Sequence, residues 1–288
     1  MNWKQTLFWS FSTAAIFYYF LLFGVFVFVG QEEMQLFIPE WWYIRECLFQ
    51  PGGFCAVAGQ WIIQYYRQPM SAVVLHTVLL VGCGFMVYRI LRCFSDKTYL
   101  LFLSLLPVLY LVKMSIHGEY LVDGTVGVVL MLLALSVSLK VRRAGSIAGY
   151  GIASTLFLCG LTGLLSVCYA FLYTLLALLR YKTSRQRLAA AACLIPALFI
   201  YLFSGWLGIP VPLSDGWMPE AYLEIQRLPH YYMYRVWTFF TLSIVGVALF
   251  ARFVPVIGEK SKWMDRVALV VCLITALVSI RFCLPEPW

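Results

Sequence analysis

Long apolar runs, separated by short charged segments, follow one another along almost the whole chain. A helix needs about 20 mostly apolar residues to cross the hydrocarbon core of a bilayer, and fewer where the bilayer thins. By this measure the pattern predicts an all-α fold, a polytopic transmembrane helical bundle with about nine spans. No long polar linker interrupts the runs, so we expect a single transmembrane domain over residues 1–288. The predicted spans are residues 6–29, 71–91, 98–115, 121–139, 144–160, 163–179, 188–207, 236–253 and 267–283.

The apolar stretch from Ala144 to Leu179 is too long for one ordinary span. Gly160 and Gly163 lie at its midpoint, where glycines favour a tight turn. We therefore expect two crossings joined at this turn. The glycines within residues 144–151 are typical of close packing between helices.

The charged residues predict the orientation of the bundle. With the N-terminus in the cytoplasm, fifteen of the 21 Lys and Arg residues fall on the inner side and ten of the 13 Asp and Glu residues on the outer side. This distribution follows the positive-inside rule, so we expect a cytoplasmic N-terminus and an extracytoplasmic C-terminus. The basic residues sit in small groups between spans, not on one face, so the net charge of +8 does not indicate a nucleic-acid partner. A composition of 62% hydrophobic and 12% charged residues likewise excludes an ordinary soluble domain.

Two predicted outer loops are long. The first, residues 31–70, has two parts joined by a turn signal at Gln50 to Gly53. Its second part predicts a helix lying flat at the membrane surface, with Gln60 and Gln64 on the polar side. The second loop, residues 208–234, predicts an irregular lid or a short helix near residues 220–227. The apolar side of the helix in the first loop consists of Phe54, Val57, Ala58, Trp61, Ile62 and Tyr65.

Two acidic groups in the outer loops are candidates for chemistry. Glu32 and Glu33 follow the first span directly, where a carboxylate can bind a divalent cation or act as a general base on a hydroxyl group. The alternative is that both are solvated and simply follow the charge rule. Glu119 and Asp123, four residues apart after His117, share a helix face if the fourth span begins early. Asp123 lies at the apolar boundary, which favours a functional role, but capping of the fourth helix explains these acids equally well.

Basic and thiol groups give weaker signals. Arg227, His230 and Arg235 can bind a pyrophosphate or anchor the chain in the headgroup layer. His76 lies inside the second span, where we expect the imidazole to pair with a neighbouring helix. Cys47 and Cys55 share the first outer loop, so a disulfide between them can form in an oxidising compartment. Neither GxxxxGK[ST] nor HExxH occurs, so the chain lacks the signatures of a P-loop ATPase and of a zinc protease.

The order of these features resembles the GT-C class of membrane glycosyltransferases over residues 1–207. Acids follow the first span, a long first outer loop carries interfacial helices, and a short second outer loop carries more acids. The resemblance implies a transferase that takes a sugar from polyprenyl phosphate at the outer face of a bacterial inner membrane. It implies Glu32 or Glu33 as the base, and binding of the acceptor or of Mg²⁺ or Mn²⁺ by Glu119 and Asp123, with Glu33 as a further metal ligand. The usual Asp-containing pair is Glu-Glu here.

Two other function classes are alternatives to the enzyme. In a non-enzymatic scaffold or assembly protein the acids only set topology and the aromatic loops bind partners. A transporter is less favoured, because ionisable groups near the membrane centre are scarce and no inverted repeat is visible. The turn at residues 51–54 with Gln60, Gln64 and Tyr65 is similar to a loop in an uncharacterised family of bacterial polytopic membrane proteins. Longer members of that family continue beyond the membrane part, so we expect this chain to be the membrane part of a longer protein.

Overall fold

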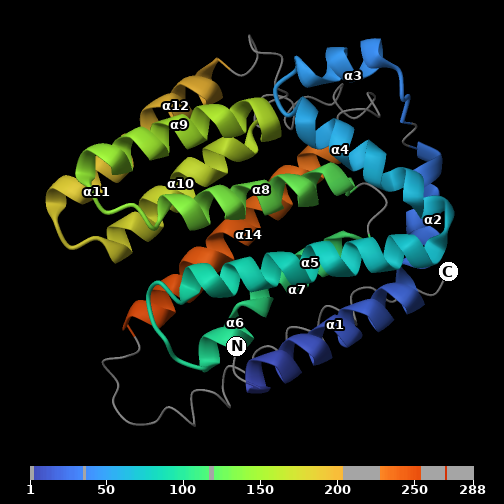
Figure 1. Cartoon of the computed structure of the whole chain (residues 1–288), viewed down its shortest axis with the longest axis horizontal. Helices are drawn as coiled ribbons and strands as arrows, with labels where there is room; N and C mark the ends of the chain where they lie inside the picture. Colours follow the sequence, from blue (N-terminus) through green and yellow to red (C-terminus); the bar gives the residue numbers. More distant parts are fainter. Residues whose placement is uncertain (1–2, 35–36, 117–119, 204–227, 254–269, 271–288) are drawn as a thin grey trace.

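A computed structural model describes residues 3–34, 37–116, 120–203, 228–253 and 270 (Figure 1). All regular secondary structure in these ranges is helical, as the hydrophobic pattern predicts. The helices are α1 (Trp3–Phe23), α2 (Val25–Met34), α3 (Trp41–Leu48), α4 (Gly53–Ile63), the 3₁₀ helix η1 (Gln64–Arg67), α5 (Pro69–Leu91), α6 (Tyr99–Leu103), α7 (Leu105–Met114), α8 (Val122–Ser138), α9 (Ala144–Thr162), α10 (Leu165–Arg180), α11 (Ser184–Ala191), α12 (Leu194–Leu202) and α14 (Leu228–Phe253).

Eight apolar helical segments coincide with the first eight predicted spans. Four of them are long and apolar enough to cross a membrane, namely Gln5–Phe23, Pro69–Leu91, Ala144–Thr162 and Ser184–Leu202. The ninth predicted span, residues 267–283, lies outside the described residues apart from residue 270. The helices are therefore compatible with a membrane protein that has four candidate spans, and the number nine stays a prediction. The shorter apolar helices cover Tyr99–Met114, Val122–Ser138, Leu165–Arg180 and Trp237–Arg252.

Helices α5 and α8 form the centre of the bundle and pack against each other (Figure 1). Helix α5 also packs against α1, α2 and α7, whereas α8 also packs against α4, α9 and α10. Because α6 and α7 bring the chain back between them, α5 and α8 run in the same direction. The first turns of both helices therefore meet at one end of the pair, and their last turns meet at the other end.

Helix α4 buries a different face from the predicted one. Phe54, Trp61 and Tyr65 of the predicted apolar side are 41%, 51% and 48% exposed. The buried residues are Gly53, Cys55, Gly59 and Ile63, because α4 packs against α8 and α9 as well as α3. The exposed aromatic side chains remain compatible with a lipid surface. The sequence pattern indicated one apolar side, whereas α4 has a second side of small residues that packs into the bundle.

The predicted turn between the fifth and sixth spans is confirmed, and a second glycine turn packs against it. Gly163 has a φ of +61° and separates α9 from α10. Gly52, with a φ of +84°, packs directly on Gly163 and donates its backbone N–H to the carbonyl oxygen of Gly160 at 3.1 Å. L-residues with side chains rarely adopt such a positive φ. The two glycine turns therefore fasten the first long loop to the α9–α10 hairpin.

Other boundaries differ from the sequence predictions. The first predicted span is divided at Gly24, beyond which α2 turns away from the axis of α1 (Figure 1). Helix α14 begins at Leu228, so the predicted end of the second long loop is helical. Of the three glycines within residues 144–151, only Gly151 packs closely, against Tyr173 and Cys193, whereas a Cβ added at Gly145 or Gly149 would have no neighbour within 4 Å. Small residues therefore mediate close packing at one position of that stretch and not along all of it.

Candidate functional site

A buried polar cluster joins the end of α2 to the beginning of α8; we define it as Gln31, Tyr120, Asp123 and Thr125. The Gln31 side chain is 1% exposed, and its Nε2 donates to the carbonyl oxygen of Tyr120 at 2.9 Å. The hydroxyl groups of Tyr120 and Thr125 lie 3.1 Å apart and share a hydrogen bond. Since buried polar groups are costly unless paired, the bond from Gln31 holds α2 against the segment just before α8.

Asp123 is the acidic member of the polar cluster and lies in the first turn of α8. Its Oδ1 accepts a hydrogen bond from the backbone N–H of Gly124 at 2.6 Å. A Cβ added at Gly59 of α4 would lie 2.8 Å from the backbone nitrogen of Asp123, so the two helices touch through main chain at this point. The side chain is half-buried, and no Lys or Arg among the described residues forms an ion pair with it. Asp123 therefore presents a partly desolvated carboxylate near a helix N-terminus, where negative charge is favoured.

A second buried group lies one helical turn back along α2. The hydroxyl of Tyr66 in η1 forms a short hydrogen bond with Nε2 of His76 in α5. The imidazole stacks on Phe28 of α2, with ring centroids 4.3 Å apart and planes inclined by 9°. His76 is fully buried, and within the described part of the chain its Nδ1 has no hydrogen-bond partner. The expectation that His76 pairs with a neighbouring element is confirmed.

The structure brings together the two segments that carry Glu32 and Asp123. Glu32 is half-buried and directly follows Gln31, so it lies beside the segment that contacts Tyr120. The side chain of Glu33 is not among those described, and His117 and Glu119 lie outside the described residues. Helix α8 begins at Val122, so the early start that would place Glu119 and Asp123 on one helix face is wrong. The N-cap of α8 is Leu121, which forms no side-chain cap. Of the capping hypothesis, only the favourable position of the Asp123 charge in the first turn of the helix remains.

The predicted phosphate-binding residues cannot be placed in this cluster. Arg227 lies outside the described residues, and the side chains of His230 and Arg235 in α14 are not described. Cys47 and Cys55 are both free, so the disulfide that the sequence left open is not formed. In the described ranges, no group of three His, Cys, Asp or Glu side chains is placed to hold a metal ion. Of the three predicted metal ligands, only the Asp123 side chain is described.

Sequence reasoning missed several residues of this region. Gln31 and Tyr120 directly adjoin the two acidic segments, but an amide and a phenol carry no signal for contact between distant helices. Gly59 resembled any other small residue of a surface helix, although it is the point at which α4 meets Asp123. One feature of the sequence pointed to Tyr66, since it lies shortly before the second span, which contains His76.

A family model described as a family of unknown function, DUF6057, matches residues 1–282. The chain belongs to this family. No curated protein and no solved structure matches it. The DUF6057 match extends through every described helix, so the polar cluster and both ends of the α5–α8 pair lie inside the family's region.

Proposed function

We propose that this DUF6057 chain is a membrane transferase similar to the GT-C class, acting on a polyprenyl-phosphate-linked sugar. The proposal places the acidic segments at the outer face of a bacterial inner membrane, in a chain that crosses about nine times from a cytoplasmic N-terminus. One observation carries the proposal. The hydrogen bond from Gln31 to Tyr120 brings the segment with Glu32 beside the segment with Asp123, although they are about 90 residues apart in sequence.

The proposed chemistry is inverting glycosyl transfer. Glu32 or Glu33 accepts the proton of an acceptor hydroxyl, whose oxygen then attacks the anomeric carbon of the sugar. The bond from that carbon to the phosphate oxygen breaks, and the phosphate leaves on its polyprenyl chain. The half-buried Asp123 carboxylate offers the oxygen ligand that Mg²⁺ or Mn²⁺ prefers, with Glu33 and Glu119 as further ligands, and the bound ion would neutralise charge on the departing phosphate.

Further cations serve the leaving group in this proposal. We assign Arg227, His230 and Arg235 to it, because guanidinium and imidazolium groups stabilise phosphate oxygens. His117 lies beside Glu119 in the second outer loop and is assigned to the acceptor.

A non-enzymatic scaffold is the second candidate, and a different observation favours it. The backbone of Asp123 packs directly on Gly59, and its carboxylate accepts a bond from its own neighbour Gly124. Both contacts are consistent with a purely structural carboxylate. The exposed rings of Trp41 and Trp42 on α3, which are 71% and 61% exposed, then provide a surface for a partner protein or for headgroups.

Amide substitutions distinguish the two candidates. Membranes containing the wild-type chain, Glu32→Gln, Glu33→Gln or Asp123→Asn are supplied with radiolabelled polyprenyl-phosphate glucose, mannose and galactose. The enzyme proposal predicts transfer of label by the wild type and at least about a hundredfold loss in Asp123→Asn and in one of the Glu variants. Glu46→Gln is the matched control, since Glu46 is exposed on α3 and lies outside the polar cluster. Unchanged transfer in all three variants would remove the enzyme proposal and leave the scaffold.

A further inference from the structure

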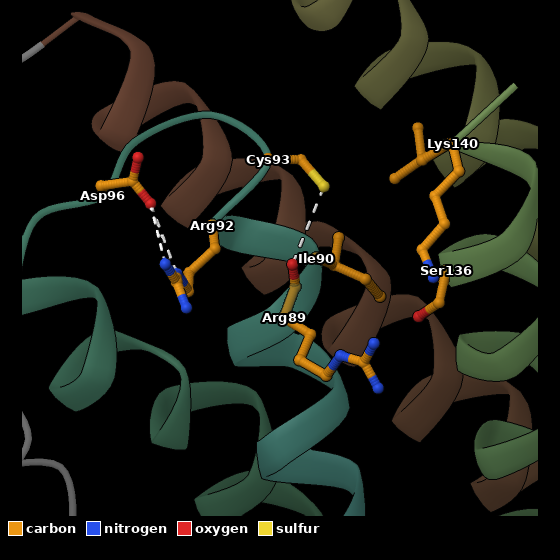
Figure 2. Close-up of a pocket in the computed structure, with 8 residues that line it drawn as sticks. Arg89, Ile90, Arg92, Cys93, Asp96, Ser136 and Lys140 are labelled. Carbon is orange, nitrogen blue, oxygen red and sulfur yellow. Dashed lines mark hydrogen bonds and ion pairs between the residues drawn. The ribbon is translucent and has the colours of Figure 1, made fainter. Parts of the chain in front are cut away.

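A recess of about 250 Å³ lies at the end of the α5–α8 pair that is opposite the polar cluster (Figure 2). The last turn of α5, the segment that follows it and the end of α8 line it. Its walls include three cationic side chains and one carboxylate. The lining residues are Arg89, Ile90, Arg92, Cys93, Asp96, Ser136, Leu139 and Lys140.

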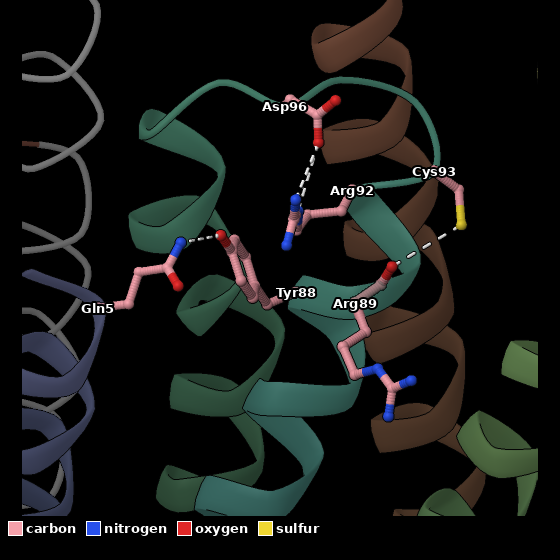
Figure 3. A network of polar contacts seen from close by, with 6 residues as sticks. All are labelled: Gln5, Tyr88, Arg89, Arg92, Cys93 and Asp96. Carbon is pink, nitrogen blue, oxygen red and sulfur yellow. Dashed lines mark hydrogen bonds and ion pairs between the residues drawn. The ribbon is translucent and has the colours of Figure 1, made fainter. Parts of the chain in front are cut away.

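One of the three cations already has partners. Arg92 forms an ion pair with Asp96, with Nη2 3.2 Å from Oδ1, and its guanidinium lies 6.0 Å from the ring centre of Tyr88. The Tyr88 ring is itself held in place, because its hydroxyl accepts a hydrogen bond from Nε2 of Gln5 at 2.8 Å (Figure 3). Asp96 therefore neutralises Arg92 and not the other cations of the recess.

The other two cations face the recess without a carboxylate. Figure 2 shows the Arg89 guanidinium on the side away from Asp96, with the side chains of Ser136, in α8, and Lys140, just after α8, opposite it. In the ranges that the structure describes, neither Arg89 nor Lys140 forms an ion pair. Two positive charges and a hydroxyl group from two different helices therefore line the same space.

The backbone directly after Lys140 is held by the residue that follows α10 and by α11. The hydroxyl of Tyr181 donates to the carbonyl oxygen of Val141 at 2.7 Å, and Nε2 of Gln186 donates to that of Arg142 at 2.7 Å. Arg89 is held equally well, because it belongs to the last turn of a 23-residue helix. Binding of a ligand between them therefore carries no entropy cost for ordering either backbone segment.

We propose that this recess binds the phosphate group of an anionic ligand between Arg89 and Lys140, with Ser136 as a further donor. A guanidinium can donate two parallel hydrogen bonds to phosphate oxygens, an ammonium adds a point charge, and the hydroxyl completes the set. A recess of about 250 Å³ accommodates a phosphate with part of the group that carries it. The proposal is independent of the transferase activity, since it concerns the opposite end of the bundle.

Topology alone does not explain this arrangement. The positive-inside rule and the negative charge at helix C-termini both favour basic residues at this end. Neither effect requires that a cation in the last turn of α5 and one just after α8 face one shared recess. The nearby Lys97 and Arg142 obey the same rule but do not line the recess, so they provide the matched comparison.

Two titrations of the purified full chain in a neutral detergent test the proposal and distinguish the source of the phosphate. One uses inorganic phosphate, followed by calorimetry; the other uses phosphatidylglycerol, followed by native mass spectrometry. The variant Arg89→Gln/Lys140→Gln is compared with Lys97→Gln/Arg142→Gln, which removes the same charge outside the recess. We expect wild-type and control proteins to bind alike, and the recess variant to bind at least about tenfold more weakly in one titration or both.

Each outcome bears on the proposal. A selective loss with inorganic phosphate identifies a soluble ligand, and a selective loss with phosphatidylglycerol identifies a lipid headgroup. Equal binding by the two double variants in both titrations, or no binding by the wild type in either, would overturn the proposal. If the recess variant does not fold, Ser136→Leu takes its place, because it fills the recess without changing charge; wild-type affinity in that variant would also overturn it.

Discussion

The two ends of the α5–α8 pair handle polar side chains in opposite ways. At the end where both helices begin, Gln31, Tyr66 and His76 are buried and bonded to other helices or segments. At the end where both helices finish, the described ion pair of Arg92 and Asp96 is 53% and 82% exposed. Neutral polar groups can be buried when they are paired, whereas charges are far more costly to remove from water. The first end therefore fixes its neutral polar groups in place, whereas the described ion pair at the second end stays in contact with water.

The main-chain contact between α4 and α8 at the first end gives the largest expected effect. Gly59→Leu would push a side chain into the backbone of Asp123, which cannot move without shifting α8. We expect a loss of about 3 kcal/mol in the free energy of unfolding, at the upper end of overpacking costs. Thermal unfolding in detergent measures it against Gly82→Leu, since Gly82 of α5 has no neighbour within 4 Å of an added Cβ. Equal melting temperatures for the two variants would contradict the main-chain contact between α4 and α8.

The buried Tyr66–His76 pair gives the next largest effect. Tyr66→Phe removes the partner of Nε2 and leaves a fully buried imidazole without a described hydrogen bond. An unsatisfied buried group of this kind costs about 2 kcal/mol. The adjacent Tyr65→Phe is the control, because that ring is 48% exposed, and we expect it to change stability by less than about 0.5 kcal/mol. An equal loss of stability in the two variants would show that the buried hydrogen bond between Tyr66 and His76 does not stabilise the fold.

Gln31→Met sharpens the same comparison with a smaller change. The substitution keeps the length of the side chain but removes the donor to the Tyr120 carbonyl. We expect a loss of about 1 kcal/mol, the net value of a typical hydrogen bond. Hydrogen exchange at the backbone of residues 120–125 should also increase, because α2 no longer holds the start of α8. Unchanged exchange in this segment would mean that α2 does not fix it.

The second end should give the smallest effect. Replacing Arg92 by Gln, Asp96 by Asn, or both completes a double-mutant cycle for the exposed ion pair. We expect a coupling energy of about 0.2–1 kcal/mol, which decreases in high salt. A coupling above about 2 kcal/mol would contradict the contrast between the two ends.

The sequence pattern predicted most of the helices, and the reason is physical. Apolar runs indicate which helices avoid water, so the eight described apolar helical segments and the Gly163 turn could be found from the hydrophobic pattern and the glycines alone. The breaks near Gly24 and Ser104 were missed, because tertiary packing decides whether one apolar run forms one helix or two. The buried face of α4 was missed for a related reason. Its apolar side looked like the packing side, whereas the contact with α8 is made by Gly59.

The candidate site was less accessible from sequence than the fold. Acidic residues near span ends indicated Glu32 and Asp123, since a carboxylate near lipid is costly and so suggests a functional role. The contact that joins their segments runs from an amide to a backbone carbonyl, and every residue has such a carbonyl. The recess at the other end was equally hidden. Arg89 and Lys140 looked like topology signals, and only the shared direction of α5 and α8 brings them together.

The account depends most on the two ends of the α5–α8 pair facing opposite sides of a membrane. Single cysteines in place of Glu46, near the first end, and Lys97, near the second, test this directly in a background where all nine native cysteines are serine. Both positions are exposed, so a membrane-impermeant maleimide can reach them. We predict labelling of the Glu46→Cys chain in intact cells and of the Lys97→Cys chain only in inverted vesicles. Labelling of both from the same side would contradict the account.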